Sequence, residues 1–326
     1  MDSVNSSTTN SAQILLVGAG QLGSRYLQGL AACETPLIIT VIDPSQKSLV
    51  TAQTRWEEVA GGISPHEIHF FQTLEGLADE VDLCLVTTTA DVRVLVIEQV
   101  LSTSRVCYWV LEKVLAQSVG QIVQLEQSLS GAQGVWVNTV RRACSWHQRI
   151  LQQLPGESPW QILGEGGAWG LACNSIHYID LIAWWTSEEL ISVDIVGLEK
   201  WFPSKRDGFW EVSGKLQMFY SGGSELELSA DKSNTRFSLT LRNGQANWRL
   251  DESDGNFTNS SGFSLPGKLE FQSELTGPLV DQILKIGKCS LPALPESAKM
   301  HRSLITALLD HWNASHQSND TLLPIT

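Results

Sequence analysis

Short apolar runs and longer helix-like stretches alternate along the chain as far as Val140. The apolar runs are Gln13–Val17, Leu37–Ile42, Ile68–Phe71, Val81–Thr87, Val106–Leu111 and Val135–Val140. Between most of them, apolar residues recur at helical spacing, as in Leu22–Leu30, Val92–Leu101 and Val119–Leu129. Strands that are apolar on both faces and separated by helices are typical of a parallel sheet covered on both sides. The pattern predicts a doubly wound α/β domain, of the Rossmann type, over residues 12–140.

The spacing of apolar residues changes after about residue 190, where apolar and polar positions alternate. The alternating sets are Leu216, Met218 and Tyr220; Leu226, Leu228 and Ala230; Phe237, Leu239 and Leu241; and Ala246, Trp248 and Leu250. Gly222-Gly223 lies between the first and second sets, and Asn243-Gly244 lies between the third and fourth. Both are sequences that favour tight turns. We therefore expect a second, α+β domain over residues 141–326 with a large, mainly antiparallel sheet arranged as a meander. Asp251–Gly267 is predicted to be a loop, and a final helix is predicted around Ser297–Ser315.

Composition agrees with two folded domains. The chain has 326 residues, 42% hydrophobic and 17% charged, which is unlike a disordered chain. A formal net charge of -13 argues against a nucleic-acid-binding surface, because phosphate contacts need clustered Lys and Arg. The six cysteines form no C-x-x-C pair, and no apolar stretch approaches the ~20 residues that cross a membrane. With a polar, disordered tail at residues 1–11 instead of a signal peptide, we expect a cytoplasmic protein without disulfides, bound metal or membrane contact.

A glycine-rich turn joins the first predicted strand to the first predicted helix. The sequence at 14–23, ILLVGAGQLG, is a full G-x-G-x-x-G in the context that dinucleotide binding requires. Gly18 would make the tight turn, Gly20 would let the backbone approach a pyrophosphate, and Gly23 would allow the helix to pack closely. The first turn of the following helix, with Gln21 and Leu22, would offer free N–H groups to the phosphates.

The second predicted strand ends in an acidic residue. Asp43 follows Gly23 at the sequence separation where a carboxylate accepts hydrogen bonds from the hydroxyls of the adenosine ribose. A carboxylate there repels a 2′-phosphate, and no Arg follows immediately. The sequence therefore predicts NAD as cofactor, with NADP the less favoured alternative.

Three further stretches carry a resemblance to a known family. Val81–Thr89 occupies the place of a "D-hydrophobic-A-T-P" segment, Glu112-Lys113-Val114 is close to Glu-Lys-Pro, and the sequence at 173–180, CNSIHYID, is similar to a D-x-x-x-H-x-x-D helix. With these motifs the chain resembles the glucose–fructose oxidoreductase / inositol dehydrogenase / MocA family over nearly its whole length. The resemblance implies that Thr87, Thr88 and Glu112 belong to the cofactor site.

The resemblance also implies a role for each residue of the reaction centre. Lys113 would lie beside the nicotinamide and hydrogen-bond the reacting oxygen, and His177 would exchange a proton with a secondary alcohol or its ketone. Asp180, three residues on and so on the same helical face, would shape the substrate pocket. Imidazole suits the proton exchange because it titrates near neutral pH.

The chain departs from the family pattern at two of these positions. Val114 replaces the proline of Glu-Lys-Pro, and Cys173 replaces the acid four residues before the histidine. Asn174, on the same face as His177, could accept the imidazole N–H through its carbonyl oxygen. Without an acid beside it, we expect His177 to keep a pKa near the ordinary ~6.5.

The segment before the second sheet, 202–211, mixes cations with aromatic residues. Lys205 and Arg206 could pair with a carboxylate or phosphate on a substrate. The leading hypothesis is an NAD(H)-dependent oxidoreductase for a sugar, sugar acid or nucleotide sugar, as in family members of surface-polysaccharide pathways. One alternative is a non-catalytic NAD-binding sensor or scaffold, and another is a reductase of a non-sugar carbonyl or unsaturated ring, as in the biliverdin reductases. We expect a homo-oligomer that pairs through the C-terminal sheet.

Overall fold

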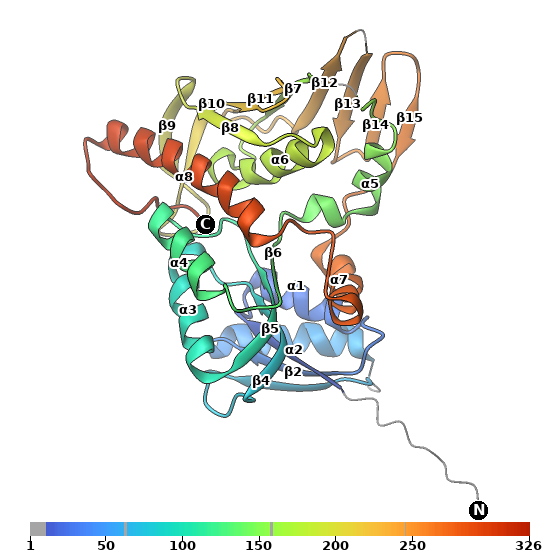
Figure 1. The fold of residues 1–326 in the computed structure, drawn as a ribbon, viewed down its shortest axis with the longest axis vertical. Coiled ribbons are helices and arrows are strands. Elements are labelled where there is room, and N and C mark those ends of the chain that lie inside the picture. Colours follow the sequence, from blue (N-terminus) through green and yellow to red (C-terminus); the bar gives the residue numbers. More distant parts are fainter. Residues whose placement is uncertain (1–10, 62–63, 157–158, 245) are drawn as a thin grey trace, which may run out of the picture.

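The first sheet of the computed structural model has six parallel strands in the order β3-β2-β1-β4-β5-β6 (Figure 1). The structure describes residues 11–61, 64–156, 159–244 and 246–326, so the predicted tail lies outside it apart from Ser11. The strands are β1 (Ala12–Val17), β2 (Leu37–Ile42), β3 (Glu67–Phe71), β4 (Glu80–Val86), β5 (Arg105–Leu111) and β6 (Gly134–Val137). The predicted doubly wound sheet is confirmed. Strand β4 ends one residue earlier than predicted, at Val86, and β6 ends three residues earlier, at Val137, before the 3₁₀ turn η1 (Val140–Ala143).

Helices cover both faces of this sheet, which explains why its strands are apolar throughout (Figure 1). One face is covered by α1 (Gln21–Leu30), α2 (Gln46–Ala60) and α7 (Gln272–Ile286). The other is covered by α3 (Ala90–Thr103) and α4 (Val119–Ser128). Helix α7, which covers α1, comes from far along the chain. The predicted domain boundary near residue 140 remains a prediction.

The second sheet has nine strands and is mixed, so the predicted meander is wrong in one respect. Its order is β15-β14-β13-β12-β7-β11-β10-β8, with β9 on β10; the bounds are β7 (Gln161–Gly166), β8 (Leu190–Asp194), β9 (Leu198–Pro203), β10 (Trp210–Tyr220), β11 (Glu225–Ala230), β12 (Ser238–Asn243), β13 (Ala246–Asp251), β14 (Asn256–Asn259) and β15 (Ser264–Pro266). The β10–β11 and β12–β13 hairpins are confirmed. Between them lies β7, parallel to β11, which separates two strands that are neighbours in the sequence.

The predicted loop at Asp251–Gly267 is also wrong, because it contains β14 and β15. Polar turn residues dominate the segment, and the strands form because β13 offers a free edge. The Asp251 carboxylate accepts hydrogen bonds from the N–H groups of Ser253 and Asp254 and closes the first turn. Phe257, which is fully buried, anchors β14 to the core.

Two helices cover the inner face of the second sheet and connect it to the first. These are α6 (Leu171–Thr186), which packs on β10 and β11, and α8 (Leu294–His316), which packs on both α6 and α4; the short α5 (Ser145–Leu151) lies beside η1. The predicted final helix is confirmed but begins three residues earlier, since Pro295 is tolerated in a first turn. None of the described helices is both long and apolar enough to cross a membrane.

Helix α7 is fixed to the start of the chain by small residues and one carboxylate. A Cβ added at Gly29 would lie 2.7 Å from the Cβ of Thr276, so only glycine permits this closeness of α1 and α7. Asp281 accepts hydrogen bonds from the N–H groups of Glu34 and Thr35 at 2.8 and 3.0 Å. Burial raises the pKa of Asp281, but the hydrogen bonds from Glu34 and Thr35 outweigh it and the pKa lies below its ordinary value.

Asp281→Ala should lower the free energy of unfolding at pH 7 by about 1–3 kcal/mol, because two N–H donors lose their acceptor. Urea denaturation measures the loss. The exposed Asp79→Ala is the matched control and should change stability by less than about 0.5 kcal/mol.

The loss should also depend on pH. The contribution of a carboxylate with a lowered pKa is complete above its unfolded pKa of ~3.9 and disappears as pH falls through its folded pKa. The difference between Asp281→Ala and the unmodified protein should therefore shrink below about pH 4. A difference that stays constant down to pH 2.5 would show that the carboxylate charge is irrelevant.

Candidate functional site

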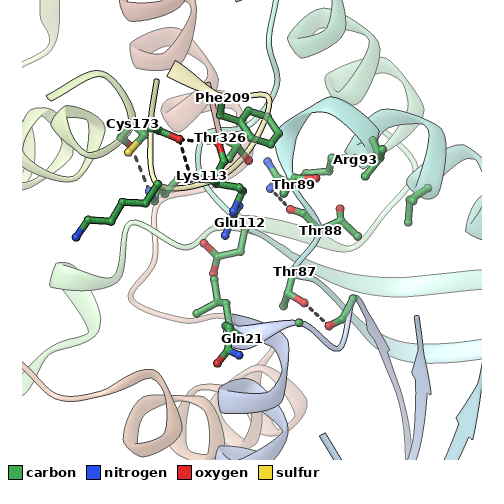
Figure 2. A pocket seen from close by; sticks show the side chains of 18 of the residues that line it. Gln21, Thr87, Thr88, Thr89, Arg93, Glu112, Lys113, Cys173, Phe209 and Thr326 are labelled. Atoms are coloured by element: carbon green, nitrogen blue, oxygen red, sulfur yellow. Dashed lines mark hydrogen bonds between the residues drawn. The ribbon is translucent and has the colours of Figure 1, made fainter. Parts of the chain in front are cut away.

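A cleft of about 1460 Å³ runs from the glycine turn to the second sheet. Figure 2 shows Gln21 at one end, Thr87, Glu112 and Lys113 along its middle, and Cys173 and Phe209 at the other end. The carboxyl ends of β1, β2, β4 and β5 meet here, as they do at ligand sites of open parallel sheets. The cleft is large enough for a dinucleotide together with a small substrate.

The glycine turn is built as the sequence motif predicts. A Cβ added at Gly23 would lie 1.8 Å from the carbonyl oxygen of Gly18, so glycine is required for this close packing. Gly18 has φ +95°, a conformation that side chains disfavour. A Cβ added at Gly20, by contrast, would meet no protein atom within 4 Å and would enter the cleft. Gln21 and Leu22 follow in the exposed first turn of α1 and line the cleft.

Asp43 stands at the end of β2, directly beside this turn. Its carboxylate accepts hydrogen bonds from the N–H of Ala19 at 2.7 Å and of Ser45 at 2.8 Å. It therefore supports the glycine turn and also lines the cleft. Gly20, the N-terminus of α1 and Asp43 fit the pyrophosphate and ribose of a dinucleotide.

Thr87 and Thr88 lie in the turn after β4 and line the cleft. The Thr87 hydroxyl donates to the carbonyl oxygen of Gly18 at 2.6 Å, which ties this turn to the glycine turn. Arg93, a fully buried residue of α3, donates to the carbonyl oxygens of Thr88, Val114 and Leu115. Because one guanidinium binds both loops, Arg93 fixes the spacing between the ends of β4 and β5.

Glu112 is the first residue after β5, and it is 4% exposed. Its Oε1 accepts hydrogen bonds from the Tyr26 hydroxyl at 2.5 Å and from the Asn138 amide at 2.7 Å. Tyr26 and Asn138 orient the carboxylate at the wall of the cleft. The following Lys113–Val114 peptide bond is cis.

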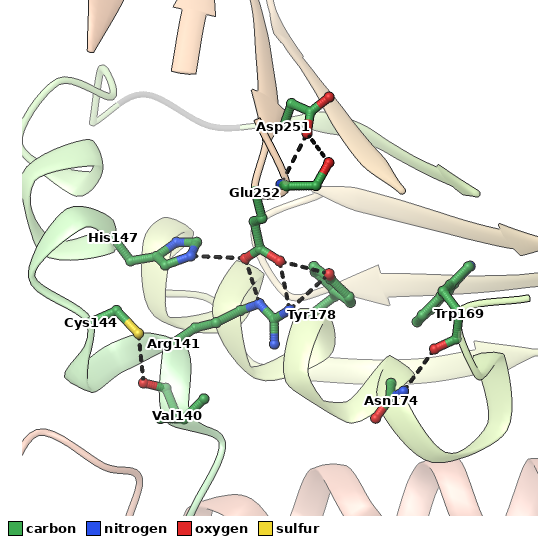
Figure 3. A network of polar contacts seen from close by, with 10 residues as sticks. Val140, Arg141, Cys144, His147, Trp169, Asn174, Tyr178, Asp251 and Glu252 are labelled. Atoms are coloured by element: carbon green, nitrogen blue, oxygen red, sulfur yellow. Dashed lines mark hydrogen bonds and ion pairs between the residues drawn. The ribbon is translucent and has the colours of Figure 1, made fainter. Parts of the chain in front are cut away.

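Lys113 connects the first sheet to α6. Its ammonium donates to the carbonyl oxygen of Cys173 at 3.2 Å and to Asn174 Oδ1 at 2.9 Å. The Asn174 amide in turn donates to the carbonyl oxygen of Trp169 at 2.8 Å, a contact seen in Figure 3. The Asn174 oxygen, which the sequence offers as an acceptor for the imidazole N–H, accepts from Lys113. The ammonium is thereby held at the centre of the cleft.

His177 lies one turn further along α6, and the residues that line the cleft do not include it. Its Nδ1 is buried without a hydrogen-bond partner among the described residues. The expectation of an ordinary imidazole pKa is wrong. Burial lowers the pKa of His177 well below its usual value, and the cations Arg141 and Lys113 lower it further. The ring is therefore neutral over the physiological range.

A buried ionic network lies behind α6 (Figure 3). Glu252 pairs with Arg141 at 2.7 Å and with His147 at 2.9 Å, and it accepts a hydrogen bond from the Tyr178 hydroxyl at 3.0 Å. Burial raises the pKa of Glu252, but Arg141 and His147 outweigh it and lower the pKa strongly. The network anchors α6 to η1, to α5 and to the turn after β13.

The structure separates the three remaining substrate candidates. The carboxylate of Asp180 is fully buried and is bound by Arg142 at 2.7 Å and by the Thr139 hydroxyl at 2.8 Å, away from the lining of the cleft. Lys205 and Arg206 are exposed in the loop between β9 and β10 and line the far end of the cleft. Their assignment to substrate remains a prediction.

Sequence reasoning missed two buried charged residues that line the cleft, Arg93 and Glu211. Arg93 lies in the predicted helical stretch Val92–Leu101, and no motif distinguishes it from an ordinary helix residue. Glu211 is the last residue of the segment 202–211. It lies in β10, and only the fold brings its side chain to the first turn of α6.

Several solved structures share this fold at low sequence identity. An oxidoreductase from Agrobacterium radiobacter in complex with NAD+, L-tartaric acid and magnesium has a TM-score of 0.72 and 12% identity, over 93% of this chain and 97% of that one. Scyllo-inositol dehydrogenase from Lactobacillus casei with bound NAD(H) and scyllo-inositol has a TM-score of 0.63 and 15% identity, over 91% and 95%. A super-repressor mutant of Gal80p from Saccharomyces cerevisiae has a TM-score of 0.67 and 13% identity, over 96% and 100%.

No protein family and no curated protein matches the sequence significantly. The likeness to solved structures covers both sheets and the cleft between them. The chain therefore shares the fold of these proteins, a Rossmann-like parallel sheet followed by a mixed, mostly antiparallel sheet of nine strands.

Proposed function

We propose that the protein binds NAD(H) in the cleft and transfers a hydride between this cofactor and a sugar, sugar acid or nucleotide-sugar derivative. The observation that carries the proposal is the position of Lys113, whose ammonium is held by Asn174 midway between the glycine turn and the second sheet. The bound nicotinamide supplies the hydride acceptor or donor.

The residues at one end of the cleft bind the cofactor. The N-terminus of α1 and Gly20 hold the pyrophosphate, Asp43 holds the adenosine ribose, and Thr87, Thr88 and Glu112 shape the path toward Lys113. NAD(H) is favoured over NADP(H), because the Asp43 carboxylate repels a 2′-phosphate.

Lys113 orients the substrate. An ammonium has three N–H donors, and two are directed at Cys173 and Asn174. The third can donate to the substrate oxygen at the reacting carbon and stabilise the negative charge that develops there. Lys205 and Arg206 bind an anionic or polar group of the substrate at the far end. The alternative is a non-catalytic NAD sensor. Two observations support it: Cys173 replaces the acid of the family pattern, and the chain shares its fold with Gal80p.

Cofactor preference tests Asp43. NADH should bind more tightly than NADPH, and Asp43→Ala should narrow the difference by about tenfold, about 1.4 kcal/mol, because the like-charge repulsion is removed. Quenching of tryptophan fluorescence measures both affinities. Equal affinities in the unmodified protein would remove Asp43 from this role.

Access of the pyrophosphate tests Gly20. Gly20→Val should weaken NADH binding by at least about tenfold, because the new side chain enters the cleft without meeting protein atoms. Gly131→Val is the matched control, since a Cβ there also meets no atom and Gly131 lies outside the cleft. It should leave NADH affinity unchanged, and circular dichroism should show that both variants fold.

Turnover tests Lys113 once a screen of sugars, sugar acids and nucleotide sugars has found a substrate. Lys113→Met should lower kcat on the order of 10²-fold, because it removes a donor to the charged transition state, and should leave NADH affinity nearly unchanged. The exposed Lys288→Met should keep normal turnover. Normal turnover of Lys113→Met would contradict the proposed role.

A further inference from the structure

Position 173 leaves the reaction centre without an acid on α6. Burial and the nearby Glu211 raise the pKa of the Cys173 thiol to about 12, so the thiol keeps its proton at neutral pH. His177 is neutral and absent from the cleft lining. Neither residue of α6 is suited to exchange a proton with a substrate beside Lys113.

A carboxylate reaches the same place from the second sheet. Glu211, in β10, is 8% exposed and lines the cleft. Its Oε2 accepts a hydrogen bond from the N–H of Ala172 at 2.8 Å, and the carboxylate interacts electrostatically with the neighbouring Cys173 thiol. The Glu211 carboxylate is therefore bound to the first turn of α6, at the residue before position 173.

The backbone before α6 leaves room for this carboxylate. Gly170 has φ +85°, and a Cβ added there would lie 3.2 Å from Glu211 Oε1. A side chain at position 170 would therefore crowd the carboxylate. A glycine at this position lets α6 begin directly against Glu211.

Lys113 and Glu211 converge on the first turn of α6 from different sheets. Lys113 donates to the carbonyl oxygen of Cys173, and Glu211 accepts from the preceding residue, Ala172. Lys113 acts on Glu211 electrostatically, and both side chains line the cleft. A substrate oxygen bound to Lys113 would thus have a carboxylate nearby.

We propose that Glu211 is the catalytic residue that exchanges a proton with the substrate, the role that the family resemblance implies for His177. The inference rests on the proposed function. In the direction of oxidation, the substrate O–H bond breaks and its proton moves to the Glu211 carboxylate. The C–H bond breaks with its electron pair moving to NAD+, and a C=O bond forms. Glu211 then releases its proton to water.

The charged groups around Glu211 set its pH dependence. Burial raises its pKa, while the Cys173 thiol and the Lys113 ammonium oppose the rise without cancelling it. Lys205, Arg206 and Asp231 line the same cleft. A base with a raised pKa is inactive below that pKa, so oxidation should slow as pH falls through a value above the ~4.3 of an ordinary Glu.

The test is the pH profile of oxidation by the unmodified protein, Glu211→Gln and Glu211→Asp. Glu211→Gln should lose the acidic limb and lower kcat on the order of 10²-fold, while NADH affinity stays within about twofold. Glu211→Asp should retain an acidic limb at a shifted pH. If Glu211→Gln does not fold, the pH profile of Glu211→Asp tests the proposal in its place. In protein without cofactor, infrared titration should show a carboxyl signal that protonates above pH 4.3 and is missing from Glu211→Gln.

Matched variants separate this proposal from its rivals. Glu199→Gln, on the neighbouring strand β9 and outside the cleft lining, should keep the profile. His177→Asn should keep the acidic limb, and its disappearance in that variant would overturn the assignment to Glu211. An unchanged profile in Glu211→Gln would overturn the inference alone. Binding of NADH without turnover of any substrate would overturn the proposed oxidoreductase function and the inference with it.

Discussion

The contact between the Lys113 ammonium and the first turn of α6 is the interaction on which the site depends. It joins the end of a parallel strand to a helix that belongs to the other sheet, through Cys173 and Asn174. The packing of α8 on α4 and α6 already holds the two sheets together, and the Lys113 contact joins them at the cleft itself. One cleft thereby contains the glycine turn, a fixed cation and a buried carboxylate.

The buried charge of Arg93, near this contact, is satisfied by the backbone. Arg93 has no bonded carboxylate among its described hydrogen bonds, and its guanidinium donates to carbonyl oxygens from two loops. Burial lowers the pKa of Arg93 to about 10, so the guanidinium remains charged at neutral pH. A cation fixed in this way holds the loops after β4 and β5 at a constant distance, because movement of either loop would leave the buried charge without acceptors.

The first sheet and the cofactor end of the site were predictable because their signals are local. Each apolar run is recognisable by itself, and the glycine turn and Asp43 both lie in the short segment from Gln13 to Asp43. The insertion of β7 between β11 and β12 was not predictable, because pairing partners distant in sequence determine it. The strands β14 and β15 were missed for the same reason: the free edge of β13 overrides the turn-rich composition.

The substrate end of the site depends on such distant pairings. Lys113 and His177 follow from the family resemblance, but Glu211 reaches the first turn of α6 only because β10 and α6 pack together. The low pKa of His177 arises from its burial and from Arg141, a residue whose position in η1 no motif indicates. A motif can thus identify a residue without revealing the burial and the neighbouring charges that determine its pKa.

The return of α7 to α1 has a consequence for how the chain folds during synthesis. All strands of the first sheet have been translated once the ribosome passes Val137, but one side of α1 stays uncovered until Gln272–Ile286 has emerged. The apolar residues on the α7 side of the sheet, among them Leu30, remain open to other chains during that interval. Late closure by α7 therefore leaves the α1 side of the first sheet open to aggregation, or to capture by chaperones, until α7 has been synthesised.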